Sequence, residues 1–286
     1  MNQSAERIDK VKFGPWAIVT GASSGIGKEF SRQLAANGLN IVLVARRLEL
    51  LKELGQNLEK EFGVQCRAVQ VDLSDENFIG TIKEATQDLD IGLVVSNAGT
   101  GNPGSFIKKN RDDLLIDVRL SVTAHLELCH HFATVLVKRG HGGILLVGAM
   151  GASHGVPYMA NSGAAKAYVS ALGQALHFEL KDQGVHVTVL TPGFIDTPVI
   201  PKLLEDPGAL PMKPMSAERC VTEGLEALRA NRAAYIPGLL NRIMNRLVPV
   251  SVSQKMEAKN AKKVAARVFP ARAEFQKSVL DLVFPA

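Results

Sequence analysis

The stretch Trp16-Ala17-Ile18-Val19-Thr20-Gly21-Ala22-Ser23-Ser24-Gly25-Ile26-Gly27 decides the fold. Its first five residues form an apolar run typical of a buried strand, and residues 26–37, closed by Gly38, predict a helix. Glycines at such a turn let the backbone approach a pyrophosphate, and the helix N-terminus supplies amide donors. A purely structural turn is the alternative, but this placement favours a phosphate site. The residues expected to line it are Gly21, Ser23, Ser24, Gly25, Ile26 and Gly27.

Apolar runs and amphipathic stretches alternate along the rest of the chain. Further strands are expected at residues 40–45, 65–71, 91–96, 143–148, 185–190 and 234–236. Further helices are expected at residues 47–62, 112–138, 162–182 and 216–230, and another helix is expected to open at Ser74 as its N-cap. Repeated βαβ units predict an α/β fold, a Rossmann-type doubly wound parallel sheet of about seven strands in a three-layer αβα arrangement. We expect one domain over residues 1–238 and a basic helical extension over residues 239–286.

The bulk composition suits a globular protein. The chain has 286 residues and 46% hydrophobic content, enough for one sizeable core. No apolar run reaches the roughly 18 residues of a membrane-spanning helix, and residues 1–12 lack the apolar core of a signal peptide. The three cysteines, Cys66, Cys129 and Cys220, lack metal-ligand spacing. We therefore expect reduced thiols, no metal site and a cytoplasmic location.

The net charge of +5 is concentrated in the C-terminal extension, where residues 241–286 carry nine Lys/Arg against three Asp/Glu. The main body is therefore near neutral, and nucleic-acid binding is not expected. Arg242 and Arg246 sit four residues apart, and such a basic amphipathic segment can contact an anionic membrane surface peripherally, cap a substrate pocket or pack on another subunit. Residues 255–272 resemble a solvated helix, and residues 279–284 form an apolar end expected to dock. The apolar residues at helical spacing are Leu239, Leu240, Ile243, Met244, Leu247 and Val248.

The end of the second expected strand indicates which dinucleotide binds. An acidic residue at this place would grip a ribose 2′-hydroxyl, whereas Arg46 and Arg47 favour a 2′-phosphate. The sequence therefore favours NADP(H) over NAD(H), with a solvated helix start as the alternative. Asp72 and Leu73, after the third strand, are expected to flank the adenine, although Asp72 can equally be a helix-entry residue.

Taken together, these motifs resemble those of the short-chain dehydrogenase/reductase family. Thr20–Gly27 matches its glycine motif, Asn97–Gly99 its Asn-Ala-Gly motif and Pro192–Thr197 its Pro-Gly-x-x-x-Thr turn, and the resemblance runs from about residue 15 to 235. It implies a nicotinamide cofactor, a small-molecule carbonyl or alcohol substrate, and assembly as a homodimer or homotetramer. The further cofactor contacts that it implies are Asn97, Ala98, Gly99, Lys166, Pro192, Gly193, Ile195 and Thr197.

The expected catalytic residues depart from the family pattern. The family uses a tyrosine as proton donor, a lysine four residues later, a serine that binds the substrate carbonyl and an asparagine on the preceding long helix. Lys166 matches the lysine, but Ser162 stands at the tyrosine position, Ala149 at the serine position and Arg119 at the asparagine position. A serine hydroxyl is a far weaker acid than a phenol with a pKa near 10.

Two other side chains are candidates for the missing proton donor, and a third, Arg119, is a candidate for another catalytic role. Tyr158 lies eight residues before Lys166, roughly 12 Å along a helix, so it reaches the same ribose only if the intervening chain folds back. His154 falls in the loop that usually lines the substrate pocket, and a solvated loop histidine is the alternative. Arg119 can stabilise an anion or form a structural ion pair with Asp117 or another acid. Three further histidines on the long helix are expected in packing or oligomer faces: His125, His130 and His131.

Three functions are consistent with these residues. The first is an NADP(H)-dependent oxidoreductase with a rearranged proton donor, because hydride transfer belongs to the cofactor. The second is a binding protein that holds NADP(H) without turnover. The third is a non-redox enzyme, such as a cyclase or lyase, in which Arg119 or His154 would act on a substrate beside a bound cofactor.

Overall fold

The computed structural model describes residues 8–101, 103–151, 154–198, 213–252, 254–255 and 258. Its centre is a seven-stranded parallel sheet of order β3-β2-β1-β4-β5-β6-β9. Strand order reverses between β1 and β4, which opens a crevice at their carboxyl ends. The strands are β1 (Trp16–Thr20), β2 (Asn40–Ala45), β3 (Cys66–Gln70), β4 (Ile91–Ser96), β5 (Gly142–Val147), β6 (Val185–Leu190) and β9 (Ala234–Tyr235).

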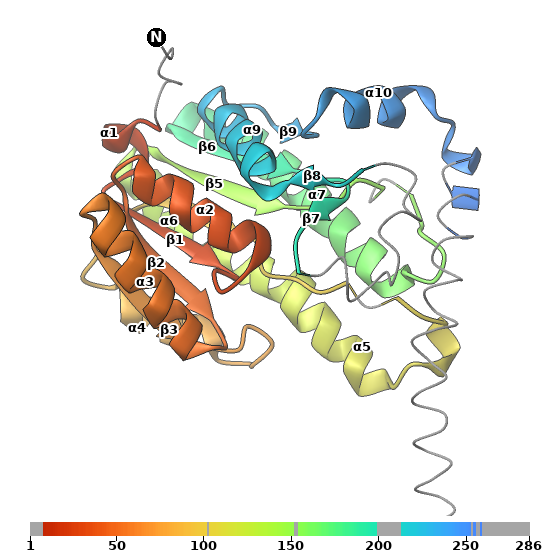
Figure 1. Cartoon of the computed structure of the whole chain (residues 1–286), viewed down its shortest axis with the longest axis horizontal. Helices are drawn as coiled ribbons and strands as arrows, with labels where there is room; N and C mark the ends of the chain where they lie inside the picture. The colour runs from red at the N-terminus through yellow and green to blue at the C-terminus, as the bar shows by residue number, and fades with distance from the viewer. Residues whose placement is uncertain are drawn as a thin grey trace, which may run out of the picture.

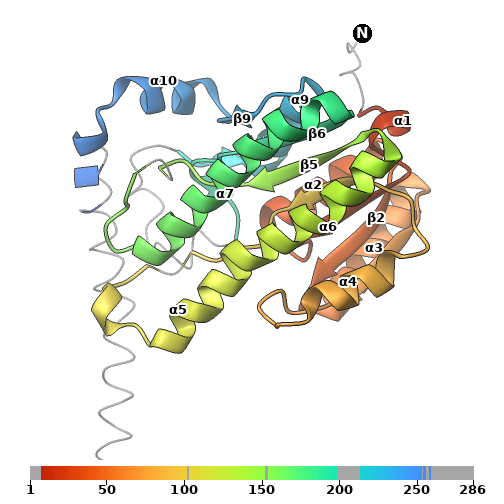
Figure 2. The same cartoon turned by 180° about the vertical axis from the view of Figure 1, so that it is seen from behind.

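Helices cover both faces of this sheet (Figure 1, Figure 2). α2, α3 and α9 enclose one apolar core with the sheet, and α4, α6 and α7 enclose the other. The central strands are buried on both sides, which explains their continuous apolar runs. The predicted three-layer Rossmann-type fold is confirmed. The helices are α1 (Lys10–Phe13), α2 (Gly25–Ala36), α3 (Leu48–Phe62), α4 (Phe78–Thr86), α5 (Arg111–Val118), α6 (Ala124–Arg139), α7 (Ala160–Leu180), α9 (Ala217–Arg229) and α10 (Leu239–Leu247).

Most predicted boundaries agree with the structure to within two residues, but the predicted start of a helix at Ser74 is wrong. α4 begins at Phe78, after Asn77. The N–H and hydroxyl of Ser74 both donate to Oδ1 of Asp72, at 3.0 and 2.7 Å. The aspartate side chain thus holds residues 72–74 in a turn, which competes with helix formation.

The single long helix predicted over residues 112–138 is also corrected. A five-residue π-helical segment, η2 (Arg119–Thr123), separates α5 from α6. Such segments interrupt the α-helical ladder and are frequent at functional sites. Within η2, the hydroxyl of Ser121 accepts a long hydrogen bond from the N–H of Thr100, at 3.4 Å, so this segment is tied to the loop after β4.

The loop predicted over residues 192–214 is described only at its two ends. There β7 (Ile195–Asp196) pairs in parallel with β8 (Met215–Ser216), which holds the ends of the loop together. Residues 199–212 lie outside the described residues. The helix expected over residues 255–272, apart from residues 255 and 258, and the apolar end at residues 279–284 lie outside them too.

Candidate cofactor and active site

One threonine fastens the glycine turn to the end of β4. Oγ1 of Thr20 accepts hydrogen bonds from the backbone N–H groups of Asn97, at 2.9 Å, and Ala98, at 3.0 Å. The side-chain amide of Asn97 donates to the carbonyl oxygen of Thr20 at 2.9 Å. The ends of β1 and β4 are therefore held together where the crevice opens.

Close contacts require glycine at two positions of the turn. Gly21 has a φ of 68°, and a Cβ there would lie 2.9 Å from Nδ2 of Asn97. A Cβ on Gly27 would collide with the carbonyl oxygen of Gly21 and lie 2.7 Å from the same Nδ2. Ser24, the residue before α2, makes no side-chain cap hydrogen bond. The first N–H groups of α2 are therefore not capped by Ser24, and the cradle fits a pyrophosphate.

The turn that follows β6 lies over this cradle. A Cβ on Gly25 would lie 3.3 Å from Cγ2 of Thr197. A Cβ on Gly193 would lie 3.4 Å from Cε of Met150 and 3.3 Å from Nδ2 of Asn241. The turn thus brings the glycine motif, the end of β5 and the start of α10 together. Asn241, which is 6% exposed, was not among the residues singled out from the sequence.

Two arginines and a serine hydroxyl gather beside the cradle at the end of β2. Arg47 donates to Oγ of Ser23 at 2.9 Å, and Arg46 lies 3.6 Å from a carboxylate oxygen of Asp72. Burial would raise the pKa of Asp72, but hydrogen bonds from Ser74 and the charge of Arg46 outweigh it and lower the pKa. The exposed side chain of Arg46 and the serine-bonded Arg47 form a cationic pair that fits a 2′-phosphate.

Arg119 lies on the surface near the end of β3. Its guanidinium is 3.6 Å from Oε1 of Glu76, and both side chains are largely exposed. The ion pair expected as its alternative role is therefore present, with Glu76 as the partner in this contact. Arg119 and Glu76 line a small cleft of ≈ 210 Å³ together with Leu73, which is 4% exposed.

Ser162 and Lys166 stand one turn apart on α7. Ser162 is 6% exposed, and Nζ of Lys166 donates to the carbonyl oxygen of Val147, at the end of β5, at 2.7 Å. A Cβ on Gly99 would lie 3.2 Å from this Nζ, so the lysine also borders the loop after β4. The lysine predicted for the cofactor site thus lies between the carboxyl ends of β4 and β5.

The pKa of Lys166 is lowered, so that its amine loses its proton more readily than that of an exposed lysine. Burial disfavours the ammonium form and lowers the pKa of Lys166 to about 8. A lysine in this range exchanges protons near neutral pH, whereas an exposed lysine stays protonated. The site therefore contains a group that can act as an acid or a base, although the tyrosine of the family pattern is absent.

Tyr158 and His154 both precede α7, in the segment that leads into the helix carrying Lys166. Tyr158 lies in a turn outside the helix, with a φ of 61°, and its carbonyl oxygen accepts from the N–H of Gly104 at 2.7 Å. Its hydroxyl makes no hydrogen bond with the described residues. His154 is half-buried, and its N–H donates to the carbonyl oxygen of Gly151 at 3.2 Å. Both remain candidate donors by position only.

His125, expected from the sequence only on a packing or oligomer face, is buried next to Lys166. Nδ1 of His125 lies 2.7 Å from Oγ of Ser96, and its buried Nε2 has no hydrogen-bond partner among the described residues. Burial, and then the charge of Lys166, lower the pKa of His125 to about 3, and the carbonyl of Ala98 offsets little of this. The imidazole is therefore neutral and adds no positive charge beside the lysine.

An open cleft of ≈ 590 Å³ lies next to the candidate site, between α7, β9 and α10. It shares Ala149, Met150 and Gly151 with the wall of the site, whereas Ser162 and Lys166 do not line it. Arg232 and Arg242 lie at its margin, each over the ring of Tyr235, at 5.3 and 5.1 Å from its centre. The remaining lining from α7 is mostly small.

Known proteins match this chain over most of its length. A family model described as short chain dehydrogenase matches residues 15–208. The 7beta-hydroxysteroid dehydrogenase of Clostridium sardiniense is 31% identical over 81% of this chain and 88% of its own. A short-chain dehydrogenase from Sphingobium yanoikuyae, solved in complex with NADPH, superposes with a TM-score of 0.74 at 30% identity, covering 79% of this chain and 88% of that one. The human inactive hydroxysteroid dehydrogenase-like protein 1 is 31% identical over 67% of this chain and 59% of its own.

Proposed function

Because the chain belongs to the short-chain dehydrogenase family, we propose that it is an NADP(H)-dependent oxidoreductase in which Lys166 and Ser162 transfer the proton. Its substrate would be a small molecule with a carbonyl or alcohol group. The observation that carries the proposal is the half-buried Lys166, with its lowered pKa, in a site that also contains a glycine cradle fitting a pyrophosphate. Similarity to an NADPH-bound relative supports the choice of cofactor.

The residues that would hold the cofactor extend across the crevice. The N–H groups at the start of α2 would bind the pyrophosphate, because the helix N-terminus offers amide donors and a positive dipole end. Arg46 and Arg47 would bind the 2′-phosphate, which NAD(H) lacks. Lys166 would contact the nicotinamide ribose, and the turn that contains Gly193 would cover the nicotinamide. These roles agree with the geometry and with the family pattern.

Proton transfer would start from the Lys166 ammonium in the direction of reduction. When bound, NADPH supplies a hydride to the carbonyl carbon of the substrate. The carbonyl oxygen then needs one proton, which Nζ of Lys166 would give up and the Ser162 hydroxyl would pass on. Side chains on a helix lean toward its N-terminus, so Lys166 leans toward the turn that carries Ser162. Oxidation of an alcohol would run the same steps in reverse, with neutral Lys166 as the base.

The substitutions in the site predict slow chemistry. Ala149 offers no donor for the substrate carbonyl, and Ser162 is shorter than a tyrosine and a weaker acid. Tyr158 and His154 are the reserve donors, because both lie in the segment that leads into α7. Arg119 stays protonated and could only stabilise an anion. Replacing Tyr158 by Phe or His154 by Gln would identify a donor other than Lys166, since only the true donor would change the pH dependence of the rate.

The proposed activity is tested with NADPH and a panel of ketones, and with NADP⁺ and the corresponding alcohols. We expect consumption of NADPH coupled to formation of alcohol, and loss of this activity in Lys166→Met. Because Lys166 would also contact the cofactor, NADPH binding of the variant is measured in parallel. Tight NADPH binding by the unaltered protein, without turnover of any compound, would contradict the proposal.

The second candidate function is a binding protein that holds NADP(H) without turnover. Ala149 favours this function, because with alanine there the site lacks the donor that would orient a substrate carbonyl. Similarity to a human relative named inactive also favours it. A cofactor that binds only the folded state raises the melting temperature by mass action. A rise with NADPH and no turnover would therefore support this function over the oxidoreductase.

We also propose that the protein assembles as a homodimer or homotetramer. Large apolar side chains are exposed on the helices of one face of the sheet, and exposed patches of this kind mark interfaces. Light scattering of the purified chain tests this, and a monomer at all concentrations would contradict it. The exposed residues on α5, α6 and α7 are Leu115, Ile116, Leu126, Val135, Tyr168 and Phe178.

A further inference from the structure

The helix α10 presents its apolar side to solvent and its polar side to the protein. Asn241 is buried, and Nδ2 donates to the carbonyl oxygen of Pro237 at 2.9 Å. On the opposite side, residues at positions i, i+1, i+4 and i+8 are exposed. They are Leu239, Leu240, Ile243 and Leu247, at 60%, 57%, 43% and 71%. A helix of a soluble monomer is normally turned the other way.

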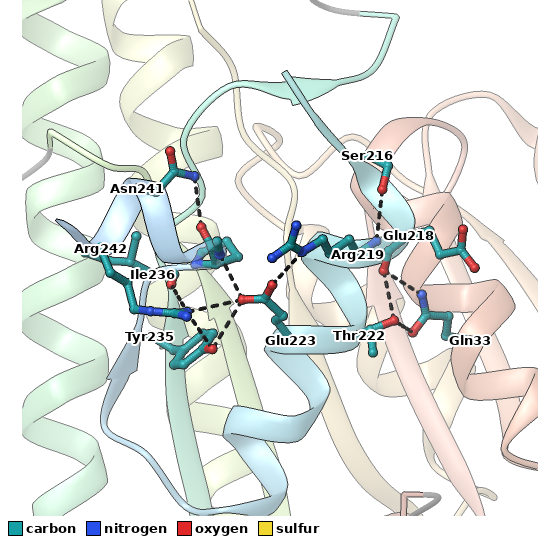
Figure 3. A network of polar contacts seen from close by, with 12 residues as sticks. Gln33, Ser216, Glu218, Arg219, Thr222, Glu223, Tyr235, Ile236, Asn241 and Arg242 are labelled. Atoms are coloured by element: carbon teal, nitrogen blue, oxygen red, sulfur yellow. Dashed lines mark hydrogen bonds and ion pairs between the residues drawn. The ribbon is translucent and has the colours of Figure 1, made fainter. Parts of the chain in front are cut away.

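The carboxylate of Glu223, here called the carboxylate hub, fixes this orientation through hydrogen bonds from its neighbours (Figure 3). Oε2 of Glu223 accepts hydrogen bonds from Arg242 at 3.2 Å, from the hydroxyl of Tyr235 at 3.2 Å and from the N–H of Gly238 at 2.8 Å. Arg219 donates to Oε1 at 2.9 Å. Burial would raise the pKa of Glu223, but these four donors lower it, so the carboxylate stays ionised and the hub persists near neutral pH. The outward apolar face is therefore held in place.

The stretch of sequence that carries the exposed face contains basic but no acidic residues. No Asp or Glu occurs between Glu226 and Glu257, whereas this stretch contains five Lys/Arg. Arg246 is exposed and lies three residues after Ile243, at the margin of the apolar face. Val250 and Val252, at 52% and 45% exposure, extend the apolar surface beyond the helix. Figure 1 shows α10 along the margin of the molecule, beside β9.

From this arrangement, we propose that α10 docks the protein onto an anionic lipid surface, with Leu239, Leu240, Ile243 and Leu247 entering the interface. An apolar stripe with cations at its margin is the pattern of helices that lie in the plane of a membrane. The lipid phosphates and carboxylates would neutralise Arg246 and Lys255, each of which contributes to surface binding. No helix among the described residues is long and apolar enough to cross a bilayer, so the contact would be peripheral. This inference does not depend on turnover.

The test is co-sedimentation of the full chain with vesicles of phosphatidylcholine alone and of phosphatidylcholine and phosphatidylserine in equal amounts. We expect binding to the mixed vesicles, weakened by salt, and weaker binding to phosphatidylcholine. Leu240→Asp with Leu247→Asp should lower binding by roughly tenfold or more, and Arg246→Glu by roughly fivefold or more. Val11→Asp is the matched control, because Val11 is 81% exposed on α1.

Two results would overturn the proposal. The first is that mixed vesicles do not retain the protein, or retain the double variant as well as the unaltered chain. The second is that the protein self-associates in the absence of lipid and that the same double variant abolishes this. The exposed face of α10 would then be a contact between copies of the chain. Circular dichroism and NADPH binding of each variant show that a loss of vesicle binding is not a loss of folding.

Discussion

Ser162 and Lys166 lie one turn apart on α7, with Ser162 buried and the lysine amine bonded to the carbonyl oxygen of Val147. In the family pattern, the first of these positions carries the acidic phenol. Here the pair combines a hydroxyl that ionises weakly with an amine whose pKa burial lowers to about 8. The acidic group of the pair is therefore the lysine, and this reversal underlies the proposed chemistry.

Carbonyl reduction is expected to slow as the pH rises through about 8, because the Lys166 ammonium is then lost. Alcohol oxidation needs the neutral amine and is expected to accelerate over the same range. Initial rates in both directions, at saturating cofactor, measure this. In Lys166→Arg the guanidinium stays protonated, so its reaction should be slow and show no such transition. A flat profile for the unaltered protein well above pH 8 would exclude Lys166 as the donor.

The cationic pair at the end of β2 is expected to set the preference for NADP(H). Replacing Arg46 and Arg47 together by Ala should raise the Kd for NADPH by roughly ten- to a hundredfold, because charge-assisted hydrogen bonds to the 2′-phosphate are lost. The Kd for NADH should change much less. Fluorescence titration measures both. Lys52→Ala is the control, since Lys52 forms an exposed pair with Glu49 on α3. Equal weakening of NADPH and NADH would contradict the assignment.

Restoring the family residues is expected to raise turnover. Ser162→Tyr places a phenol one turn before Lys166, and Ala149→Ser adds a donor for the carbonyl. The double variant should reduce ketones faster than the unaltered chain, provided that its melting temperature shows that the larger side chain fits. Ala149→Ser alone separates the two effects. If a folded double variant is no faster, the pocket differs from the family at more than these positions.

Buried His125 is expected to make the fold sensitive to mild acid. Its pKa is lowered from 6.5 to about 3 in the folded protein, so the unfolded chain binds a proton more readily between these values. Stability is therefore intact above about pH 6.5 and falls as the pH drops toward 3. The expected loss between pH 7 and pH 5 is about 2 kcal/mol. Denaturant unfolding of the protein and of His125→Asn at both pH values measures it. An identical loss in the variant would exclude His125 as the cause.

The fold could be predicted from sequence because the signals are local. The central strands are buried on both faces, so their apolar runs are continuous and bounded by turns. The glycine cradle could be predicted from its place between a strand and a helix, whereas Lys166 was predicted from the resemblance to the family. The π-helical break at Arg119–Thr123 could not be predicted in this way, because the register of a helical ladder responds to contacts such as that of Ser121 with Thr100.

Side-chain pairing in the site also depends on residues far apart in sequence. His125 is 29 residues from Ser96, and its burial reflects the packing of α6 against β4. One local signal was present, since His125 shares a helical stripe with Leu128 and Phe132, both of which are buried. Asn241 gave no comparable signal, because its burial results from the inverted orientation of α10.

The central claim is tested most directly by a single turnover of enzyme-bound NADPH with the panel of ketones over a range of pH. The account predicts that one equivalent of alcohol forms per cofactor consumed, with a rate that falls as the pH rises through about 8. It would be contradicted if the unaltered protein binds NADPH but consumes none, while the double variant Ser162→Tyr and Ala149→Ser reduces the same ketones. That outcome would identify the chain as a cofactor-binding protein.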